Sequence, residues 1–400
     1  MLNSEYDVVV IGAGPGGSVA ARNLARDGHK VLLIEKREKI GYPVRCGEAS
    51  TKLSDLQTYG PIDPSCIETI INGLYIYGPD GVNIDLHQEG TGIMLNREKF
   101  DPWLAHLAEE DGAEVVTNAR ADFVGEVNGD TRLVRIILKK SGVETTEEVR
   151  AKMVIAADGI ESRIGRSLGI DSLQKPATTC TGVDIQVEGI LTKEDYLTFW
   201  QGHDFINDGY IWSFPKQKSN VTNFGAGFLI PKKNGPSILD VTMEWLYKLF
   251  PGAKINHVVG GVIPVSSVLK DYTMDRFALV GDAAHHTNPL TGGGIAAAMR
   301  AGRFCAQTVH EGLTASSGEA ANLSHVFLKT YEKRCYDYFG RTHDFEFKFR
   351  KFLLAVNKPE QVGLYKVLQN FAKSGCKKSS FLKTPIQSAK YLFKFATFKG

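Results

Sequence analysis

The stretch VVIGAGPGGSVAARNL, residues 9–24, decides the fold of the first part of the chain. It carries a G-x-G-x-x-G pattern made by Gly12, Gly14 and Gly17. An apolar run at Tyr6–Ile11 precedes the pattern, and a segment with helical character, Ser18–Asp27, follows it. Glycines permit a tight turn and bring the backbone close to a pyrophosphate, which the N–H groups of a helix N-terminus attract. This order of elements predicts a dinucleotide site.

A second apolar run follows at His29–Lys36 and contains Glu35, 23 residues after Gly12. An acid at the end of the second strand of a β-α-β unit can bind the hydroxyls of a ribose. A glycine turn with a purely structural role is the alternative, but the surrounding strand, helix and acid favour nucleotide binding. The N-terminal part is therefore predicted to be Rossmann-like.

The bulk properties are those of an ordinary globular protein. Four hundred residues, 43% hydrophobic and 23% charged, allow two or three domains with a large core. No apolar run approaches the ~18 residues of a membrane span, and the chain starts as a strand, so we expect a cytoplasmic protein. The cysteines form no C-x-x-C pair, and neither a zinc site nor a disulfide scaffold is indicated. Cys305 and Cys335 could pair, although a reducing cytosol favours two free thiols.

The charge is unevenly distributed along the chain. Residues 341–400 contain 13 Lys and Arg against 3 Asp and Glu, a net charge of +10, so the first 340 residues carry −8 of the overall +2. One helical face at Ile386–Ala396 is apolar, with lysines opposite, which suits an anionic membrane surface at the inner face of the cell membrane. A tail packed on its own core is the equal alternative. No nucleic-acid fold signature is present, so no nucleic-acid partner is expected.

The apolar pattern predicts two interleaved domains. From about residue 177 to 270 it is strand-rich with polar alternation, typical of an antiparallel sheet. Buried-type strands at Ala151–Ala157 and Arg276–Gly281 flank this region. We expect an α/β fold whose nucleotide domain comprises residues 1–75, 95–175 and 275–310. An antiparallel-sheet (α+β) domain at 76–94 and 176–274 interrupts it, and a helical, basic region at 311–400 follows.

Three segments of the nucleotide domain can now be compared with known families: GAGPGG at 12–17, AADGIESRIGRSLG at 156–169 and ALVGDAAHHTNPLTGGGIAAAMRAG at 278–302. Together they resemble the FAD-dependent group of aromatic hydroxylases, halogenases and geranylgeranyl reductases. The resemblance implies FAD as the cofactor. It also implies that Asp282 accepts hydrogen bonds from the ribityl hydroxyls, while a helix opening at Ile295 faces the flavin N1/O2 edge. A helix N-terminus there would stabilise the negative charge of reduced flavin.

Two further segments indicate a subgroup. EKREKIGYPVRCGE (35–48) and GYIWSFPK (209–216) resemble the flavin loop and the Y-x-W-x-F-P signature of archaeal geranylgeranyl reductases. On a strand, Tyr210, Trp212 and Phe214 would share one face and could wall a substrate slot. Filling a sheet core is the alternative role for these rings. Ala49 departs from the glycine that relatives often have. The pair His285-His286 has no third ligand at metal spacing, so we expect surface or turn residues and no metal.

The resemblance implies a set of cofactor-binding residues. They are Gly12, Gly14, Pro15, Gly16, Gly17, Glu35, Lys36, Arg45, Cys46, Gly47, Ala49, Arg97, Ala121, Asp158, Gly159, Asp282, Gly293, Gly294 and Ile295.

The implied reaction is reduction of isolated C=C bonds in geranylgeranyl chains of archaeal lipid precursors such as digeranylgeranylglycerophospholipid. Such an alkene gains no enolate to hold charge, so a proton must accompany the hydride from flavin N5. Cys46 and Tyr210 are the candidate catalytic residues, and a packing role for Cys46 carries equal weight. The reductant, ferredoxin or NAD(P)H, is not specified by the sequence. An FAD monooxygenase or halogenase, and a flavin-binding scaffold without activity, are the competing functions.

Overall fold

The computed structural model describes residues 2–173, 175–206, 208–229, 235–314 and 321–374. Its first sheet has the order β15-β16-β9-β1-β2-β6, and the pairs from β16 to β6 are parallel. The strands are β1 (Glu5–Ile11), β2 (Val31–Ile34), β6 (Glu114–Val116), β9 (Val143–Ala156), β15 (Thr273–Met274) and β16 (Phe277–Leu279). Because helices cover a parallel sheet on its faces, its strands read as continuous apolar runs, and Val8, Val9 and Val10 are fully buried.

The predicted β-α-β unit is present in this sheet. Helix α1 (Pro15–Arg26) connects β1 to β2. Helices α3 (Arg97–Glu110) and α6 (Ile295–Thr314) both pack against α1. Strand β8 (Thr131–Lys140) pairs antiparallel with β9, and β7 (Ala119–Asn128) pairs antiparallel with β8, which extends the sheet. The strand predicted at 151–157 is the end of the longer strand β9, because pairing with β8 continues without a break into pairing with β1.

The second sheet has the order β14-β10-β13-β12-β11-β4-β5-β3 and is antiparallel except for the pair β11–β4. Its strands are β3 (Ala49–Ser50), β4 (Ile67–Tyr77), β5 (Asn83–Leu95), β10 (Thr179–Glu188), β11 (Tyr196–Gln201), β12 (Gly209–Lys216), β13 (Val221–Leu229) and β14 (Ile255–Pro264). The predicted boundary between residues 75 and 76 therefore falls inside β4. An apolar run identifies a strand but not the sheet that it joins.

The region expected to be strand-rich also contains a helix, α5 (Ile238–Leu249). The hydroxyl of Ser237 accepts a hydrogen bond from the Asp240 backbone N–H at 3.1 Å and caps this helix. Helix α5 packs on β13 and β10 through a cluster that includes the fully buried Leu246. The sequence prediction missed this capping signal.

Shorter helical elements connect these parts. They are α2 (Leu53–Gln57), α4 (Arg163–Ser167), η1 (Pro64–Cys66), η2 (Pro79–Gly81), η3 (Pro176–Thr178) and η4 (Gly281–Ala284).

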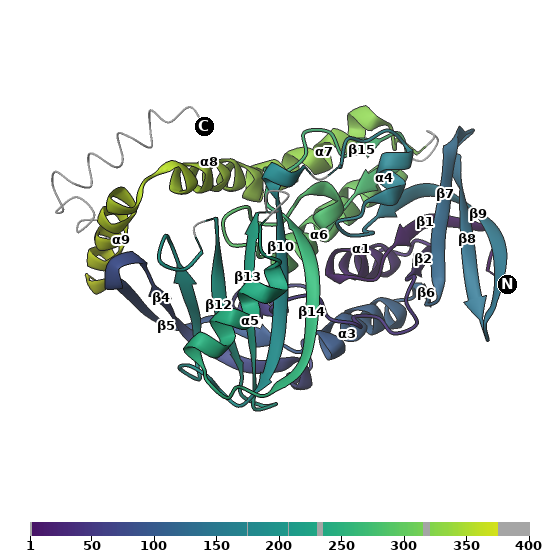
Figure 1. Cartoon of the computed structure of the whole chain (residues 1–400). Coiled ribbons are helices and arrows are strands. Elements are labelled where there is room, and N and C mark those ends of the chain that lie inside the picture. Colours follow the sequence, from purple (N-terminus) through teal and green to yellow (C-terminus); the bar gives the residue numbers. More distant parts are fainter. Residues whose placement is uncertain (1, 174, 207, 230–234, 315–320, 375–400) are drawn as a thin grey trace.

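The C-terminal region is helical, as predicted, over the part that the structure describes. Helix α7 (His325–Cys335), the π-helical turn η5 (Tyr336–Gly340) and α8 (Arg341–Ala355) follow one another directly, and α9 (Lys358–Lys373) packs against β5. Figure 1 shows α7 and α8 extending from the first sheet towards the second, with α9 beside β4 and β5. The predicted amphipathic face at 386–396 lies outside the described residues.

Candidate active site

The glycine pattern forms a tight loop between β1 and α1. Gly12 has φ +103°, and a β-carbon there would lie 2.3 Å from the carbonyl oxygen of Ala157. A β-carbon at Gly17 would lie 2.0 Å from the carbonyl oxygen of Gly12, so both positions exclude a side chain. In contrast, the space next to Gly14 is open to a distance of 4 Å. The loop thus leaves room for a pyrophosphate at the N-terminus of α1.

The carboxylate of Glu35 lies beside this loop, as the sequence predicts. Oε2 accepts a hydrogen bond from the backbone N–H of Ala13 at 3.1 Å, and Oε1 accepts one from Arg37 at 3.0 Å. These bonds fix the carboxylate at the end of β2, where it can receive ribose hydroxyls. Nearby, Lys36 forms an ion pair with Glu161 at 3.6 Å. Ala121 lies on β7, whose Ala119 N–H donates to the Glu35 carbonyl oxygen at 2.9 Å.

The three nucleotide-type segments meet at the carboxyl ends of β1, β9 and β16. A β-carbon at Gly16 would lie 2.8 Å from the Val280 side chain. Asp158 follows β9, and its Oδ2 accepts from the Ile164 N–H at 3.2 Å, whereas its buried Oδ1 has no partner among the described residues. Burial raises the pKa of Asp158. The free oxygen beside the glycine loop is what a bound cofactor hydroxyl would satisfy.

Asp282 and the turn before α6 lie after β16, where the sequence predicts the second half of the cofactor site. Oδ1 of Asp282 accepts a hydrogen bond from the Thr287 hydroxyl at 2.6 Å. A β-carbon at Gly294 would lie 2.8 Å from the same Thr287 hydroxyl, so no side chain fits in front of the helix. Helix α6 begins at Ile295, directly after this turn. The first N–H groups of any helix lack acceptors within the helix, so those of α6 can stabilise an anionic cofactor edge.

The sequence predicts surface or turn residues at His285 and His286; both are buried, so the surface alternative is wrong, and both follow the turn η4. His285, at φ +58°, ends η4, and its ring hydrogen-bonds Ser266 Oγ through Nδ1 at 2.8 Å. His286 Nδ1 accepts from the Gly281 N–H at 3.1 Å, so this side chain supports the backbone that carries Asp282. Burial lowers the pKa of His286 to about 3, which keeps the ring neutral.

A loop between β2 and β3 places Cys46 next to the second sheet. The Cys46 sulfur accepts from the Glu48 N–H at 3.2 Å and contacts the Arg97 guanidinium. Arg97 in turn forms a two-pronged ion pair with Asp101, with distances of 3.1 and 2.6 Å. Burial raises the pKa of the Cys46 thiol despite the Arg97 charge, so the thiol keeps its proton at neutral pH. Position 45 lies beside β14, because a β-carbon at Gly261 would be 3.7 Å from Arg45.

Glu48 anchors this loop, although the sequence analysis did not select it. Its Oε2 accepts from Lys216 Nζ at 2.6 Å and from Asn223 Nδ2 at 2.8 Å, and its Oε1 accepts from the Arg97 N–H at 2.8 Å. Glu48 and Lys216 are 3% and 5% exposed. The signal was present, since Glu48 ends the P-V-R-C-G-E segment and Lys216 ends GYIWSFPK. The contact between Glu48 and Lys216 could not be predicted from the sequence.

The three rings of β12 lie on one face of the strand, as the alternation predicts. The ring centres of Tyr210 and Trp212 are 5.8 Å apart, and those of Trp212 and Phe214 are 6.1 Å apart. Trp212 Nε1–H donates to Asp184 at 2.9 Å, and burial raises the pKa of that acid to about 8. The Tyr210 hydroxyl donates to the carbonyl oxygen of Thr291, which joins the wall to the turn before α6.

A pocket opens between this wall, the Gly292 turn and the C-terminal helices. Tyr210 and Trp212 line it, whereas Phe214 does not and lies instead against Gly47 and Phe199. From here on we call it the wall pocket; its lining also includes Cys180, Ile263, Gly292, Arg350, Leu353 and Tyr365. Helices α8 and α9 thus complete a cavity next to the predicted cofactor site, a role that the sequence did not predict for them.

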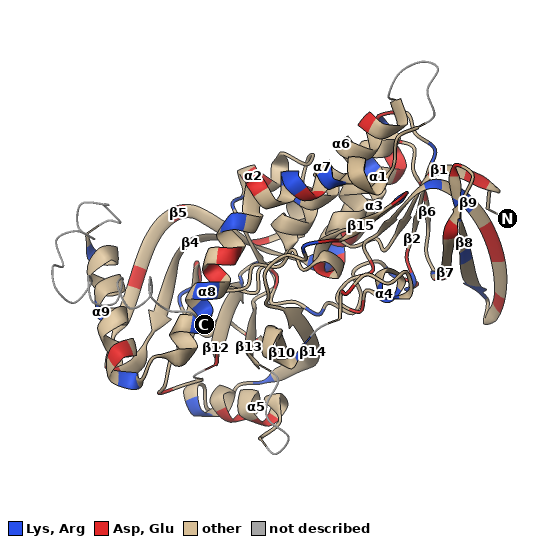
Figure 2. Cartoon of the chain, turned by 90° about the horizontal axis from the view of Figure 1, so that it is seen from above, with Lys and Arg blue, Asp and Glu red and all other residues tan. Residues whose placement is uncertain are grey.

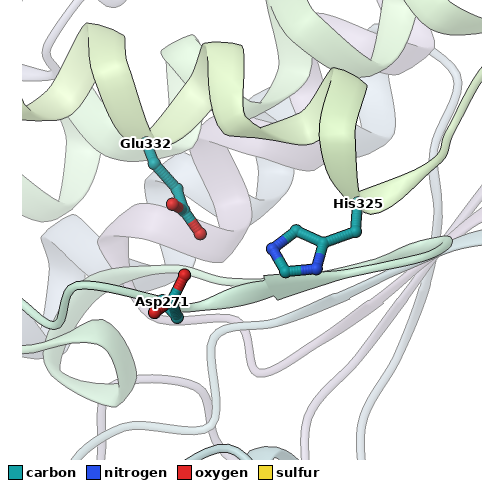
Figure 3. A group of neighbouring side chains, drawn as sticks. All are labelled: Asp271, His325 and Glu332. Atoms are coloured by element: carbon teal, nitrogen blue, oxygen red, sulfur yellow. The ribbon is translucent and has the colours of Figure 1, made fainter.

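Two further groups of side chains in the described part of the chain bear on a possible disulfide and a possible metal site. Cys305 and Cys335 are buried free thiols. Among the described residues, one group could hold a metal: Asp271 near β15, with His325 and Glu332 on α7 (Figure 3). The ammonium of Lys329 already hydrogen-bonds Asp271 and, at 2.8 Å, Glu332, so a cation occupies this group without any metal.

Comparisons with known proteins agree with this geometry. Residues 5–207 match the family described as "FAD binding domain", and residues 178–263 match "Geranylgeranyl reductase catalytic domain". A digeranylgeranylglycerophospholipid reductase of Methanosarcina mazei is 38% identical over 351 residues, covering 86% of this chain and 83% of the relative. The solved structure of a geranylgeranyl bacteriochlorophyll reductase-like protein from Thermoplasma acidophilum has a TM-score of 0.87 at 32% identity, covering 98% and 99% of the two chains.

A halogenase solved with phloroglucinol and FAD shares the fold, with a TM-score of 0.69 at 15% identity and coverage of 98% and 86%. The open space at Gly14, the fixed Glu35 carboxylate and the free Asp158 oxygen fit the cofactor that these families share, which is FAD. The chain therefore belongs to the geranylgeranyl reductase family of FAD-dependent oxidoreductases.

Proposed function

We propose that this protein is an FAD-dependent reductase that saturates isolated C=C bonds in the geranylgeranyl chains of digeranylgeranylglycerophospholipid. The observation that carries the proposal is the wall pocket, in which Tyr210 and Trp212 face the Gly292 turn beside the cofactor site. The curated relatives with this name are similar over most of the chain, which supports the same lipid as substrate. The halogenase likeness extends to the fold alone.

Bound FAD supplies the hydride for this chemistry. The chain must then hold the alkene, exclude water and deliver one proton. Cys46 suits proton delivery because its thiol stays protonated and because the next residue, Gly47, lies against Trp212 and Phe214 of β12. Tyr210 is the second candidate, and burial raises its pKa as well, but its own proton is directed at Thr291. We therefore propose Cys46 as the donor, with Tyr210 and Trp212 binding the chain.

The substrate has to come from a membrane surface. Moving a chain of about twenty carbons into water costs on the order of 16 kcal/mol, so free lipid is too scarce to be taken from solution. Within the described residues, no helix has both the length and the apolar character to cross a membrane. Exposed apolar side chains lie along α7, η5 and α8: the exposed fraction is 85% for Val326, 57% for Tyr338 and 58% for Phe345.

We infer that this surface and the basic residues 341–400 dock on anionic lipid. Figure 2 shows Lys and Arg together with Asp and Glu along α8, so the excess of basic residues in 341–400 comes from the whole stretch and not from α8 alone. A variant that ends at residue 379 should sediment less with vesicles containing anionic lipid and change little with neutral vesicles. Equal binding by the shortened and full-length proteins would assign the tail to packing instead.

The reaction itself can be tested with the flavin as the reporter. Protein reduced with dithionite under anaerobic conditions should regain oxidised-flavin absorbance when it receives the geranylgeranyl phospholipid. The product should gain two mass units for each bond reduced. A protein that stays reduced would be a flavin-binding scaffold, and a product that gains an oxygen atom would indicate a monooxygenase. In turnover the reductant would be ferredoxin or NAD(P)H, and assays supplying each one separately would identify it.

A further inference from the structure

One cation in the wall pocket has no role in the chemistry described above. Arg350 lies on α8, is 9% exposed and lines the pocket together with Tyr210, Trp212 and Leu353. The remaining lining is mostly apolar or backbone. Helix α8 therefore brings one guanidinium into a cavity whose other lining is mostly apolar.

The partners of Arg350 are neutral. Nη1 donates to the carbonyl oxygen of Val265 at 3.2 Å, and Nη2 donates to the Cys180 sulfur at 3.3 Å. Burial raises the pKa of the Cys180 thiol, so it carries no charge at neutral pH. Asp208 lines the same pocket and its charge favours the Arg350 cation, but the two side chains form no ion pair. Two hydrogen bonds leave further N–H groups of the guanidinium available.

Lys216, Arg97 and Arg132 either have an ion-pair partner or lie outside the wall pocket. Lys216 pairs with Glu48 at 2.6 Å, and Arg97 pairs with Asp101 at 2.6 Å. Arg132 bonds backbone carbonyls, as Arg350 does, but it does not line the wall pocket. Arg350 thus combines burial, a position in the pocket and no ion pair among the described residues. Burial lowers its pKa, and the neighbouring Cys180, Tyr210 and Asp208 do not restore it.

We propose that Arg350 binds the phosphate ester of the lipid substrate, an inference that rests on the proposed function. A buried charge is costly unless an opposite charge or strong hydrogen bonds compensate it, and the planar guanidinium matches two phosphate oxygens. A phosphate held there would fix the head of the lipid while its chains occupy the space along Trp212 and Tyr210. The wall pocket would then select an anionic amphiphile over a neutral prenyl lipid.

The test compares two substrates with identical chains, dispersed in detergent so that membrane docking does not contribute. One is digeranylgeranylglyceryl phosphate and the other is the neutral digeranylgeranylglycerol. The wild-type protein should prefer the phosphate by roughly 10- to 100-fold in kcat/KM, the range expected for a charge-assisted contact. Arg350→Met should abolish this preference by lowering kcat/KM for the phosphate alone. The matched control, Arg135→Met, removes a half-exposed arginine paired with Asp122 and should keep the preference.

An equal loss on both lipids, or an unchanged preference in Arg350→Met, would overturn the proposal. Should Arg350→Met fail to fold, Arg350→Lys should retain most of the preference and Arg350→Gln should lose it, with flavin absorbance reporting an intact fold. Competition by glycerol phosphate that disappears in Arg350→Gln would instead assign the site to free phosphate esters. If neither lipid reoxidises the wild-type flavin, the proposed function fails. Tryptophan-fluorescence titration with the two saturated lipids then decides whether Arg350 binds the phosphate.

Discussion

The buried pair between Glu48 and Lys216 offers a direct test of how the flavin loop is held. Lys216→Met would remove the ammonium that lies 2.6 Å from Glu48 Oε2 while keeping most of the side-chain volume. The remaining donors, Asn223 and the Arg97 N–H, would hydrogen-bond the carboxylate but leave its charge uncompensated. The loop that carries Cys46 would then be destabilised together with the fold.

The magnitude follows from burial. Removing one partner of a buried ion pair costs about 3–5 kcal/mol, and we expect the lower end because two hydrogen bonds persist. The double variant Glu48→Gln, Lys216→Met leaves no buried charge and should cost less than the sum of the two single changes. An exposed pair provides the control: Lys254 and Glu188 lie 3.6 Å apart with 78% and 58% of their side chains exposed, so Lys254→Met should cost at most about 1 kcal/mol.

Urea unfolding measures these costs, carried out with excess FAD at one fixed concentration because bound ligand adds to apparent stability. The reasoning is refuted if Lys216→Met costs under about 1 kcal/mol, or if the double-variant cost equals the sum of the single ones.

Three other outcomes are expected. Gly12→Ala should abolish FAD binding, measured by flavin fluorescence titration, because its β-carbon would lie 2.3 Å from the Ala157 carbonyl oxygen; normal affinity would show that the loop can relax. Asp184→Asn should change the pH dependence of the unfolding free energy: the pKa of about 8 in the folded state favours the protonated acid, so the wild type loses stability as pH rises from about 4 to 8 and the variant lacks this part. Parallel pH curves for the two proteins would contradict the protonated state. Cys46→Ala should slow flavin reoxidation by the lipid in single turnover, with FAD affinity unchanged; an unaffected rate would make Cys46 a packing residue.

The local features of the cofactor half could be predicted from the sequence. The loop at Gly12 and the acid at Glu35 lie in one short segment, where turn geometry and strand spacing fix their relation. The shared face of Tyr210 and Trp212 follows equally from the two-residue period of a strand. In each case the residues that carry the sequence pattern and the residues that they contact lie within about thirty positions of one another.

The features that the sequence did not predict depend on contacts between distant segments. Glu48 meets Lys216 across 168 residues, and the wall pocket needs α8 to reach Cys180. Neither of these long-range contacts produces a periodic pattern of residues that a single sequence could reveal. The burial of His286 is missed for the same reason, since its aromatic neighbours Tyr272, Tyr331 and Phe339 come from β15, α7 and η5 regions.

The path of the chain between its two sheets restricts how a lipid can enter the wall pocket. The backbone crosses from one sheet to the other four times, after β2, β5, β9 and β14. Four chain connections between the two sheets resist the hinge opening that many two-domain enzymes use. Within the described residues the chain enters α8 from η5 and returns to neither sheet after α9, so we expect the lipid to enter through a movement of these two helices.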